Sequence, residues 1–200
     1  FLGYTNNRTP ERVKEMLQQA MLQFRPAATA QINIEREDPR YNLAPPAGGL
    51  IVRVQARVMG GYEETEDAMK QIFQTALSRD NLWVSRAEHT SLAAGRFPKS
   101  LAHRIARFHL VDNTRGEPPM WRDSEIATSS FEINGTVVKG HAELSTASGD
   151  RRYSVDLLGE LQTEAAKVIA WNMVASGKFA GDGRYTRGAP PGEFPLAISF

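Results

Sequence analysis

Polar side chains whose types fit ligand binding gather in a loop near the end of the chain. Residues 181–192 contain Arg184, Tyr185 and Arg187 in a stretch dense in glycine and proline, which restrict the backbone. Two guanidinium groups beside a phenolic hydroxyl can clamp a carboxylate or a phosphate through paired hydrogen bonds. We therefore predict that these residues contact a small anionic ligand or an acidic group of a partner protein.

A second loop, at 113–121, adds Arg115 to this set of predicted ligand-binding residues. Another interpretation of the same side chains stays open. The arginines of both loops can bind backbone carbonyls, or the carboxylates of Asp112 and Asp182, and so hold the loops in place. In that case their role is structural.

Acid–base chemistry has one candidate pair. His109 and Asp112 have the residue types of a general base and acid, and with Arg184 and Arg187 as a clamp they would suit an enzyme acting on a small carboxylate or phosphate. This enzyme is an alternative; the main interpretation has no catalytic residue. His103 lies in a helical pattern and His109 in an extended one, so we predict no metal site and no cofactor.

Motifs of the common catalytic and nucleotide-binding families are missing. The sequence has no Walker A loop, no G-x-G-x-x-G after a strand, no H-E-x-x-H and no G-x-S-x-G. It also has no cysteine, which excludes disulfides, thiolate nucleophiles and cysteine-ligated metals. These absences favour a binding module over an enzyme.

Charge is balanced over the whole chain. The 24 basic and 23 acidic side chains give a net charge of +1 at pH 7, so no overall field attracts nucleic acid or an anionic membrane. No apolar run approaches the roughly 20 residues that a membrane-spanning helix needs. The one basic window, Arg96 to Arg107, is interpreted as a solvated face.

One segment near the end of the chain is apolar on both sides. If residues 168–174 are extended, Val168 and Val174 share one face, and Trp171 lies on the other. Such a strand is either buried on both faces or carries an apolar binding surface. We take the aromatic face around Trp171 as a predicted binding surface.

The elements that must position these residues begin with an alternation of strands and helices. Residues 9–25 and 63–79 have apolar side chains at helical spacing, and Thr9 with Pro10 marks a helix start. Strand-like runs flank both helices, at 1–4, 31–37, 50–59 and 82–88. This order predicts a ferredoxin-like βαββαβ half over residues 1–90.

The two helical segments also resemble each other. Residues 14–21 and 70–77 have lysine, glutamine and apolar residues at matching positions. Either this half is an internal duplication or two amphipathic helices share a common pattern, and both interpretations stay open.

The remainder is predicted as a connecting segment and a run of strands. Residues 91–124 read as a short helix at 98–106 followed by a strand with Phe108 and Leu110 on one face. From 125 to 200 the pattern is strand-like, with a hairpin signal at Asn134 and Gly135. We predict an α+β protein whose second half is an antiparallel β-meander, a sandwich or partial barrel that can share one core with the first half.

Two stretches carry a resemblance. RFHLVDNTRGEP at 107–118 and RYTRGAPPGEFPLA at 184–197, with the strands between them, resemble the C-terminal region of an uncharacterised family of bacterial proteins. The resemblance implies that the two loops recur as units and that the protein is exported. Members of that family continue past the position of Phe200, and no activity is attached to them.

The sequence therefore predicts a non-enzymatic binding or protein-interaction module for an unknown protein or a small anionic ligand. We expect it in an exported or cell-envelope compartment, where a chain without cysteine has no thiol to oxidise; the cytoplasm stays open. Because the chain opens at Phe1 and ends on an apolar run, we expect a trimmed piece of a longer chain. A structural subunit that forms homo-oligomers through exposed strand edges is a further alternative.

Overall fold

A computed structural model of the chain describes residues 3–5, 9–25 and 46–200, and separates two units, residues 1–43 and 44–200. The first unit contains helix α1 (Pro10–Gln23). Thr9 precedes it with extended backbone and Pro10 is its first residue, as the sequence predicts.

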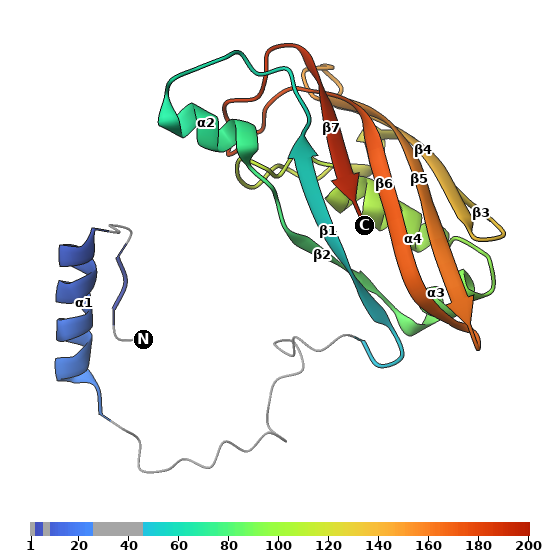
Figure 1. Cartoon of the computed structure of the whole chain (residues 1–200), viewed down its shortest axis with the longest axis horizontal. Helices are drawn as coiled ribbons and strands as arrows, with labels where there is room; N and C mark the ends of the chain where they lie inside the picture. Colours follow the sequence, from blue (N-terminus) through green and yellow to red (C-terminus); the bar gives the residue numbers. More distant parts are fainter. Residues whose placement is uncertain (1–2, 6–8, 26–45) are drawn as a thin grey trace. The chain divides into compact units, whose positions relative to one another are not determined.

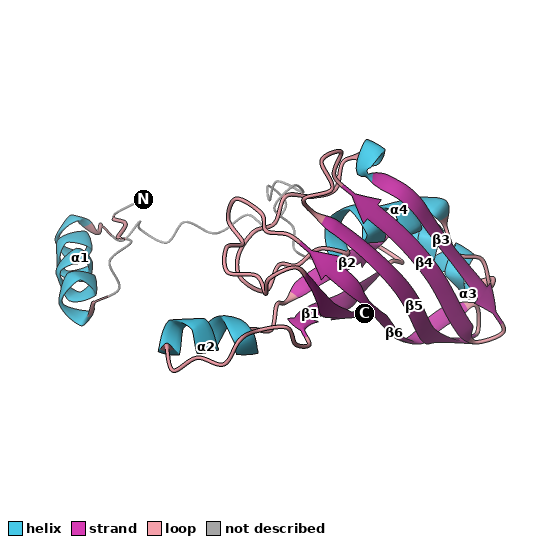
Figure 2. Ribbon diagram, turned by 90° about the horizontal axis from the view of Figure 1, so that it is seen from above, coloured by secondary structure: helices cyan, strands magenta, loops and turns pink. Residues whose placement is uncertain are grey.

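The second unit is built on one antiparallel sheet of seven strands in the order β2-β1-β7-β6-β5-β4-β3 (Figure 1). The sheet curls into a half-barrel, and helices α3 and α4 lie against one of its faces (Figure 2). The strands are β1 (Leu50–Val58), β2 (Asp80–Val84), β3 (Ile126–Asn134), β4 (Val137–Ser145), β5 (Arg152–Glu164), β6 (Lys167–Ala180) and β7 (Glu193–Ser199).

The last five strands are neighbours in chain order, so the predicted antiparallel meander is confirmed. It forms a partial barrel from a single sheet. The hairpin signal at Asn134 lies where β3 ends, and β4 begins at Val137 after a two-residue loop. Gly135 in that loop has a φ of +63°, which glycine adopts at no steric cost.

The hairpin between β5 and β6 has a less favourable loop. Glu164 pairs with Lys167, and the two residues between them, Ala165 and Ala166, have φ of +47° and +59°. A two-residue loop with both residues left-handed matches the twist of a hairpin, but residues with a Cβ adopt this conformation at a cost.

The ferredoxin-like half predicted for residues 1–90 is not confirmed. Strand β1 pairs with β2 on one side and with β7 on the other, so it belongs to the same sheet as the meander. Its inward residues Val52 and Val54 share one buried cluster with Leu196 and Ile198. The strand predicted at 31–37 lies outside the described residues.

The second predicted helix is shorter than its apolar pattern. Helix α2 covers Ala68–Thr75 instead of 63–79, and none of its residues is buried. Asp67 caps its first N–H groups. The side chains of Gln71 and Gln74 donate to the carbonyls of Thr65 and Glu63, which keeps the preceding residues extended beside the helix.

The strand predicted to reach residue 88 stops at Val84, because Ser85 caps helix α3 (Arg86–Ala93). Glu88 completes the capping box and also accepts hydrogen bonds from Ser100 and Arg104 of helix α4 (Lys99–Arg104). Burial raises the pKa of Glu88, but the hydrogen bonds from Ser85, Ser100 and Arg104 outweigh it and lower the pKa. This carboxylate joins the two helices.

The strand predicted after the short helix is wrong. Residues Ile105–His109 continue α4 as a π-helical turn, in which the N–H of Leu110 donates to the carbonyl of Ile105 over 3.0 Å. Ile105, Ala106 and Leu110 are all buried, whereas Phe108 is 41% exposed. The burial spacing is helical with one extra residue, which a π turn accommodates.

Candidate functional site

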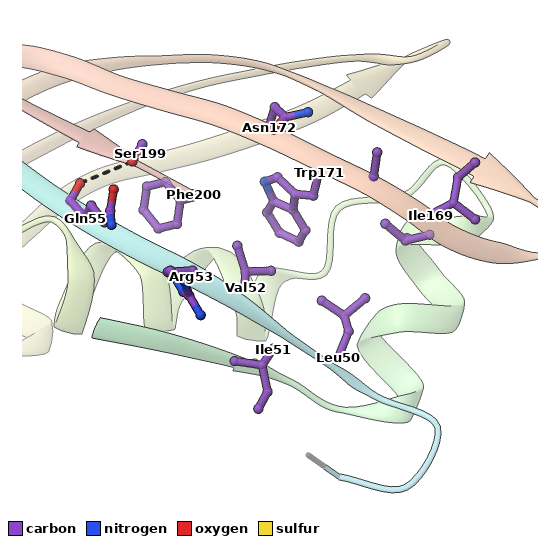
Figure 3. Close-up of a pocket in the computed structure, with 12 residues that line it drawn as sticks. Leu50, Ile51, Val52, Arg53, Gln55, Ile169, Trp171, Asn172, Ser199 and Phe200 are labelled. Carbon is purple, nitrogen blue, oxygen red and sulfur yellow. Dashed lines mark hydrogen bonds between the residues drawn. The ribbon is translucent and has the colours of Figure 1, made fainter. Parts of the chain in front are cut away.

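The main candidate site is the part of the sheet beside the last residues of the given sequence, where β1 and β6 extend further than β7. Strand β7 pairs with Gln55–Val58 of β1 and with Val174–Ala180 of β6. Strand β1 extends to Leu50 and β6 to Lys167, and no strand of the described residues pairs with these ends across the gap between them, although the Val168 N–H of β6 is bonded to His89. We call the gap between Leu50–Arg53 and Ile169–Asn172 the β1–β6 slot (Figure 3). It has a volume of about 480 Å³.

Strand alternation determines which backbone groups of β1 face the slot. Ala56 exchanges hydrogen bonds with Ser78 on the β2 side: its N–H donates to Ser78 Oγ and its carbonyl accepts from the Ser78 N–H. The N–H of Met59 donates to Pro195 of β7 instead. Odd-numbered residues of β1 therefore present their N–H and C=O groups to the β7 side, so those of Ile51 and Arg53 face the slot.

The same alternation determines which backbone groups of β6 face the slot. Met173 and Phe200 exchange both backbone hydrogen bonds, at 2.8 and 3.1 Å. Two residues along, the backbone groups of Trp171 point in the same direction, beyond the end of β7. The Trp171 side chain points from β6 toward Val52 of β1 (Figure 3), and its buried Nε1 has no partner among the described residues.

Both ends of the slot are closed. Phe200 closes the upper end and is itself 7% exposed. At the lower end the ring of His89 in α3 spans the two strands: Nδ1 lies 2.9 Å from the Gly48 carbonyl, and Nε2 accepts from the Val168 N–H at 2.9 Å. These two bonds require a neutral imidazole with its hydrogen on Nδ1. The slot is thus bounded on four sides and open on the outer face of the sheet.

The predicted ligand-binding arginines lie elsewhere. The side chain of Arg115 is completely buried, with Nη2 2.6 Å from Asp112 and 3.6 Å from Asp182, and Nη1 donates to the Tyr62 hydroxyl at 2.9 Å. Burial raises the pKa of Tyr62, and Arg115 offsets part of this rise. This geometry joins the middle and terminal loops, as the structural interpretation of the loop arginines requires.

The other three polar candidates do not converge on Trp171 either. Arg184 lies over the ring of Tyr185, 5.2 Å from its centre, and both are exposed. Arg187 lines a separate cavity of about 590 Å³, between α2 and the terminal loop, together with Tyr62 and Phe73. Of the predicted binding residues, only Trp171 is part of the β1–β6 slot.

The two residues of the alternative acid–base pair, His109 and Asp112, lie in different surroundings and contact different partners. Nδ1 of His109 lies 3.0 Å from Oδ2 of Asp80, and its ring meets Phe200 edge-on. Burial lowers the pKa of His109, while Asp80 partly raises it. Asp112 is 2% exposed and holds Arg115 and the N–H and hydroxyl of Thr114.

Metal-ligand chemistry finds no support in the described ranges. They contain no group of three or more histidine or acidic side chains that could hold an ion. His103 pairs with Asp123 at 3.2 Å and is separate from the His109–Asp80 contact. No helix among the residues placed by the structure has the length and apolarity to cross a bilayer.

Sequence reasoning found one wall of the slot and missed the rest. The apolar pattern of 168–174 indicated Trp171, because it did not alternate as a one-sided strand does. Nothing local to residues 50–54 shows that one edge of β1 is unpaired, and nothing local to His89 shows that it bridges two strands. Comparisons with protein-family models, curated proteins and solved structures find no match to this chain.

Proposed function

We propose that this protein is a non-enzymatic interaction module that binds an extended peptide segment through the facing edges of β1 and β6 in the β1–β6 slot. The observation that carries the proposal is the pair of backbone edges that face each other there, with no strand of the described residues between them. Ile51 and Arg53 present N–H and C=O groups from one side, and Trp171 presents them from the other.

The width of the slot fits a whole strand rather than a single inserted side chain. Just above the slot, β7 lies between β1 and β6, so these strands are two strand spacings apart, roughly 9.5 Å. A chain that continues along the same line can satisfy both edges at once. Unpaired strand edges are sites where natural proteins accept further strands.

The interior of the slot supports an apolar contact. Val52 is 6% exposed and faces the half-buried Trp171, while the partly buried Leu50 packs against the same core. Apolar side chains from a partner strand would extend this core and bring the stabilisation of burial, about 25 cal/mol per Å² of apolar surface.

Titration of the isotope-labelled full chain with the synthetic peptide acetyl-Gly-Glu-Val-Thr-Val-Gly-amide tests the proposal. We expect saturable NMR shifts confined to the amides of Ile51, Arg53 and Trp171 and to the Trp171 indole N–H. The variant Ile51→Pro lacks one donor that faces the slot and should bind several-fold more weakly, whereas Ile51→Thr keeps the N–H and should bind normally.

Two results would contradict the proposal. One is saturable binding that leaves these amides unshifted. The other is equal affinity of the folded Ile51→Pro and Ile51→Thr variants, because it would show that the backbone edge of β1 takes no part in binding.

An exported location belongs to the same proposal, supported by the absence of cysteine. Fractionation of the producing cells with immunodetection tests it. Recovery in the cytoplasmic fraction alone would contradict the location and leave the strand-binding proposal in place.

A further inference from the structure

A second cavity lies between helix α2 and the terminal loop, residues 181–192 (Figure 1). Its volume of about 590 Å³ falls within the roughly 300–1,000 Å³ that small-molecule sites occupy. One wall consists of residues 62–65 and of α2, and the other wall consists of residues 187–191. We call this space the α2 cavity. None of its lining residues belongs to the β1–β6 slot.

Both walls of the α2 cavity are held by the buried guanidinium group of Arg115. Its Nη1 donates to the Tyr62 hydroxyl in one wall, and its Nη2 lies 3.6 Å from Oδ1 of Asp182. The same Asp182 oxygen accepts from the N–H of Ala189 in the other wall, at 3.1 Å. The fold itself therefore positions the two walls, and preorganised walls lower the cost of binding a ligand.

Apolar and aromatic side chains line the interior of the α2 cavity. Tyr62 and Phe73 are partly buried, and Ala189 and Pro190 continue the apolar surface on the side of the terminal loop. Gly188 lies close to the opposite wall, since a Cβ there would be 3.7 Å from the Phe73 ring. An aromatic ligand body between these walls would be removed from water on both of its faces.

Four charged side chains border this apolar interior. Arg187 and Lys70 are basic, Glu63 and Glu64 are acidic, and all four residues are exposed. None of these side chains forms an ion pair or a hydrogen bond with another residue that the structure describes. Because the four charges balance, an inorganic anion beside the basic pair would also meet the two carboxylates. A ligand with one positive and one negative group finds a partner of opposite charge for each group.

From these walls and charges we infer that the α2 cavity binds a small zwitterion with an aromatic body, the chemistry of a free aromatic amino acid. The ring lies between Phe73 and the terminal loop, and the ammonium group pairs with the carboxylates of Glu63 and Glu64. The carboxylate pairs with Arg187, whose planar guanidinium group can donate two parallel hydrogen bonds to it. This site is additional to the proposed function and does not depend on it.

Three probes that share one aromatic ring test the inference. Free phenylalanine carries both charges, phenylpropionate lacks the ammonium group, and phenethylamine lacks the carboxylate. Phenylalanine titrated into the isotope-labelled full chain should give saturable NMR shifts at the amides of Phe73, Gly188 and Ala189. Because pairs between exposed charges are weak, phenylalanine should bind about two- to fivefold more tightly than either of the other probes.

Matched variants identify the group that binds each charge of the ligand. Arg187→Gln should abolish the preference for phenylalanine over phenethylamine. Arg184→Gln should keep that preference, because Arg184 is an exposed arginine of the same loop that does not line the cavity. The double variant Glu63→Gln, Glu64→Gln should abolish the preference for phenylalanine over phenylpropionate.

A second pair of variants tests the contact with the ring. Phe73→Ala should weaken the binding of all three probes several-fold. Ile72→Ala should leave it unchanged, because Ile72 is an exposed residue of α2 that does not line the cavity.

Three results would overturn the inference. No saturable binding of phenylalanine, or saturable binding that shifts only other amides, would remove the site. Equal affinity for the three probes would exclude a zwitterion as the preferred ligand. A preference over phenethylamine that persists in Arg187→Gln would exclude Arg187 as the partner of the carboxylate. Each of these results leaves the proposed function in place, since the two sites share no lining residue.

Discussion

Nη2 of Arg115 lies 2.6 Å from Oδ2 of Asp112, and both side chains are buried. The same guanidinium reaches the Tyr62 hydroxyl and the Asp182 carboxylate. One side chain thus holds together the segment after β1, the middle loop and the terminal loop. Gly116 shows how closely these loops approach, since a Cβ there would lie 2.0 Å from the carbonyl oxygen of Tyr185.

Loss of Arg115 should destabilise the fold strongly. Arg115→Met leaves the Asp112 carboxylate buried without its cation, and removal of one partner of a buried ion pair costs about 3–5 kcal/mol. Urea denaturation measures the change. The matched variant Arg184→Met removes an exposed arginine and should change the free energy of unfolding by less than about 0.5 kcal/mol. Equal effects of the two variants would show that the Arg115 network does not stabilise the loops.

The β5–β6 hairpin should be open to stabilisation. Replacing Ala165 by asparagine and Ala166 by glycine puts the preferred residues of a left-handed two-residue loop where both φ are already positive. We expect an increase of about 1–2 kcal/mol in the free energy of unfolding. As a control, Ala127→Gly in exposed β3 should lower it by about 0.5–1 kcal/mol. A double variant less stable than the parent would contradict the loop conformation.

Stability should fall as the pH is lowered through the titration of His109. Its folded-state pKa is held below the ordinary 6.5 by burial, so between these values the unfolded state binds the proton more strongly. The stability that depends on the neutral form of His109 is fully present above about pH 6.5. It is lost as the pH falls toward the folded-state pKa. An NMR titration of the ring should give a midpoint below 6.5.

His141 provides the opposite case in the same spectrum. Its hydrogen bond to Asp156 raises its pKa, and Glu143 adds to the rise. Protonated His141 stabilises the fold below pH 6.5, and this stabilisation is lost as the pH rises through the raised pKa. The effect is small, because the His141 side chain is 45% exposed. If the His109 midpoint lay above that of His141, the environments described for both rings would be wrong.

His89 should hold the lower ends of β1 and β6 together. His89→Ala removes the acceptor for the Val168 N–H and the donor to the Gly48 carbonyl, and we expect a loss of about 1–3 kcal/mol. Hydrogen exchange at Val168 should become faster, while that of Met173, bonded to Phe200, should not. The exposed His103→Ala is the control, and unchanged exchange at Val168 would contradict the bridge.

Much of the second unit follows from local pattern. Alternation in β4, where Val138, Ala142 and Leu144 are buried, and the loop at Gly135 are encoded within a few residues, because a strand has period two and a tight turn needs a left-handed backbone. The meander was therefore predictable. The π-helical turn at Phe108, where the sequence pattern predicts a strand, was not predictable. Short apolar runs fit helix and strand alike, and burial against the sheet decides between them.

The slot depends on distant partners. Sequence alone indicated that residues 168–174 are apolar on both faces and that residues 50–59 form a strand. Only the tertiary structure places β7 between these two segments and brings the edge of β1 at Arg53 and the edge of β6 at Trp171 together beside its last residues. Side-chain periodicity records which face of a strand is buried, but it carries no record of which strand lies at its edge, since the backbone groups that pair there are the same in every residue.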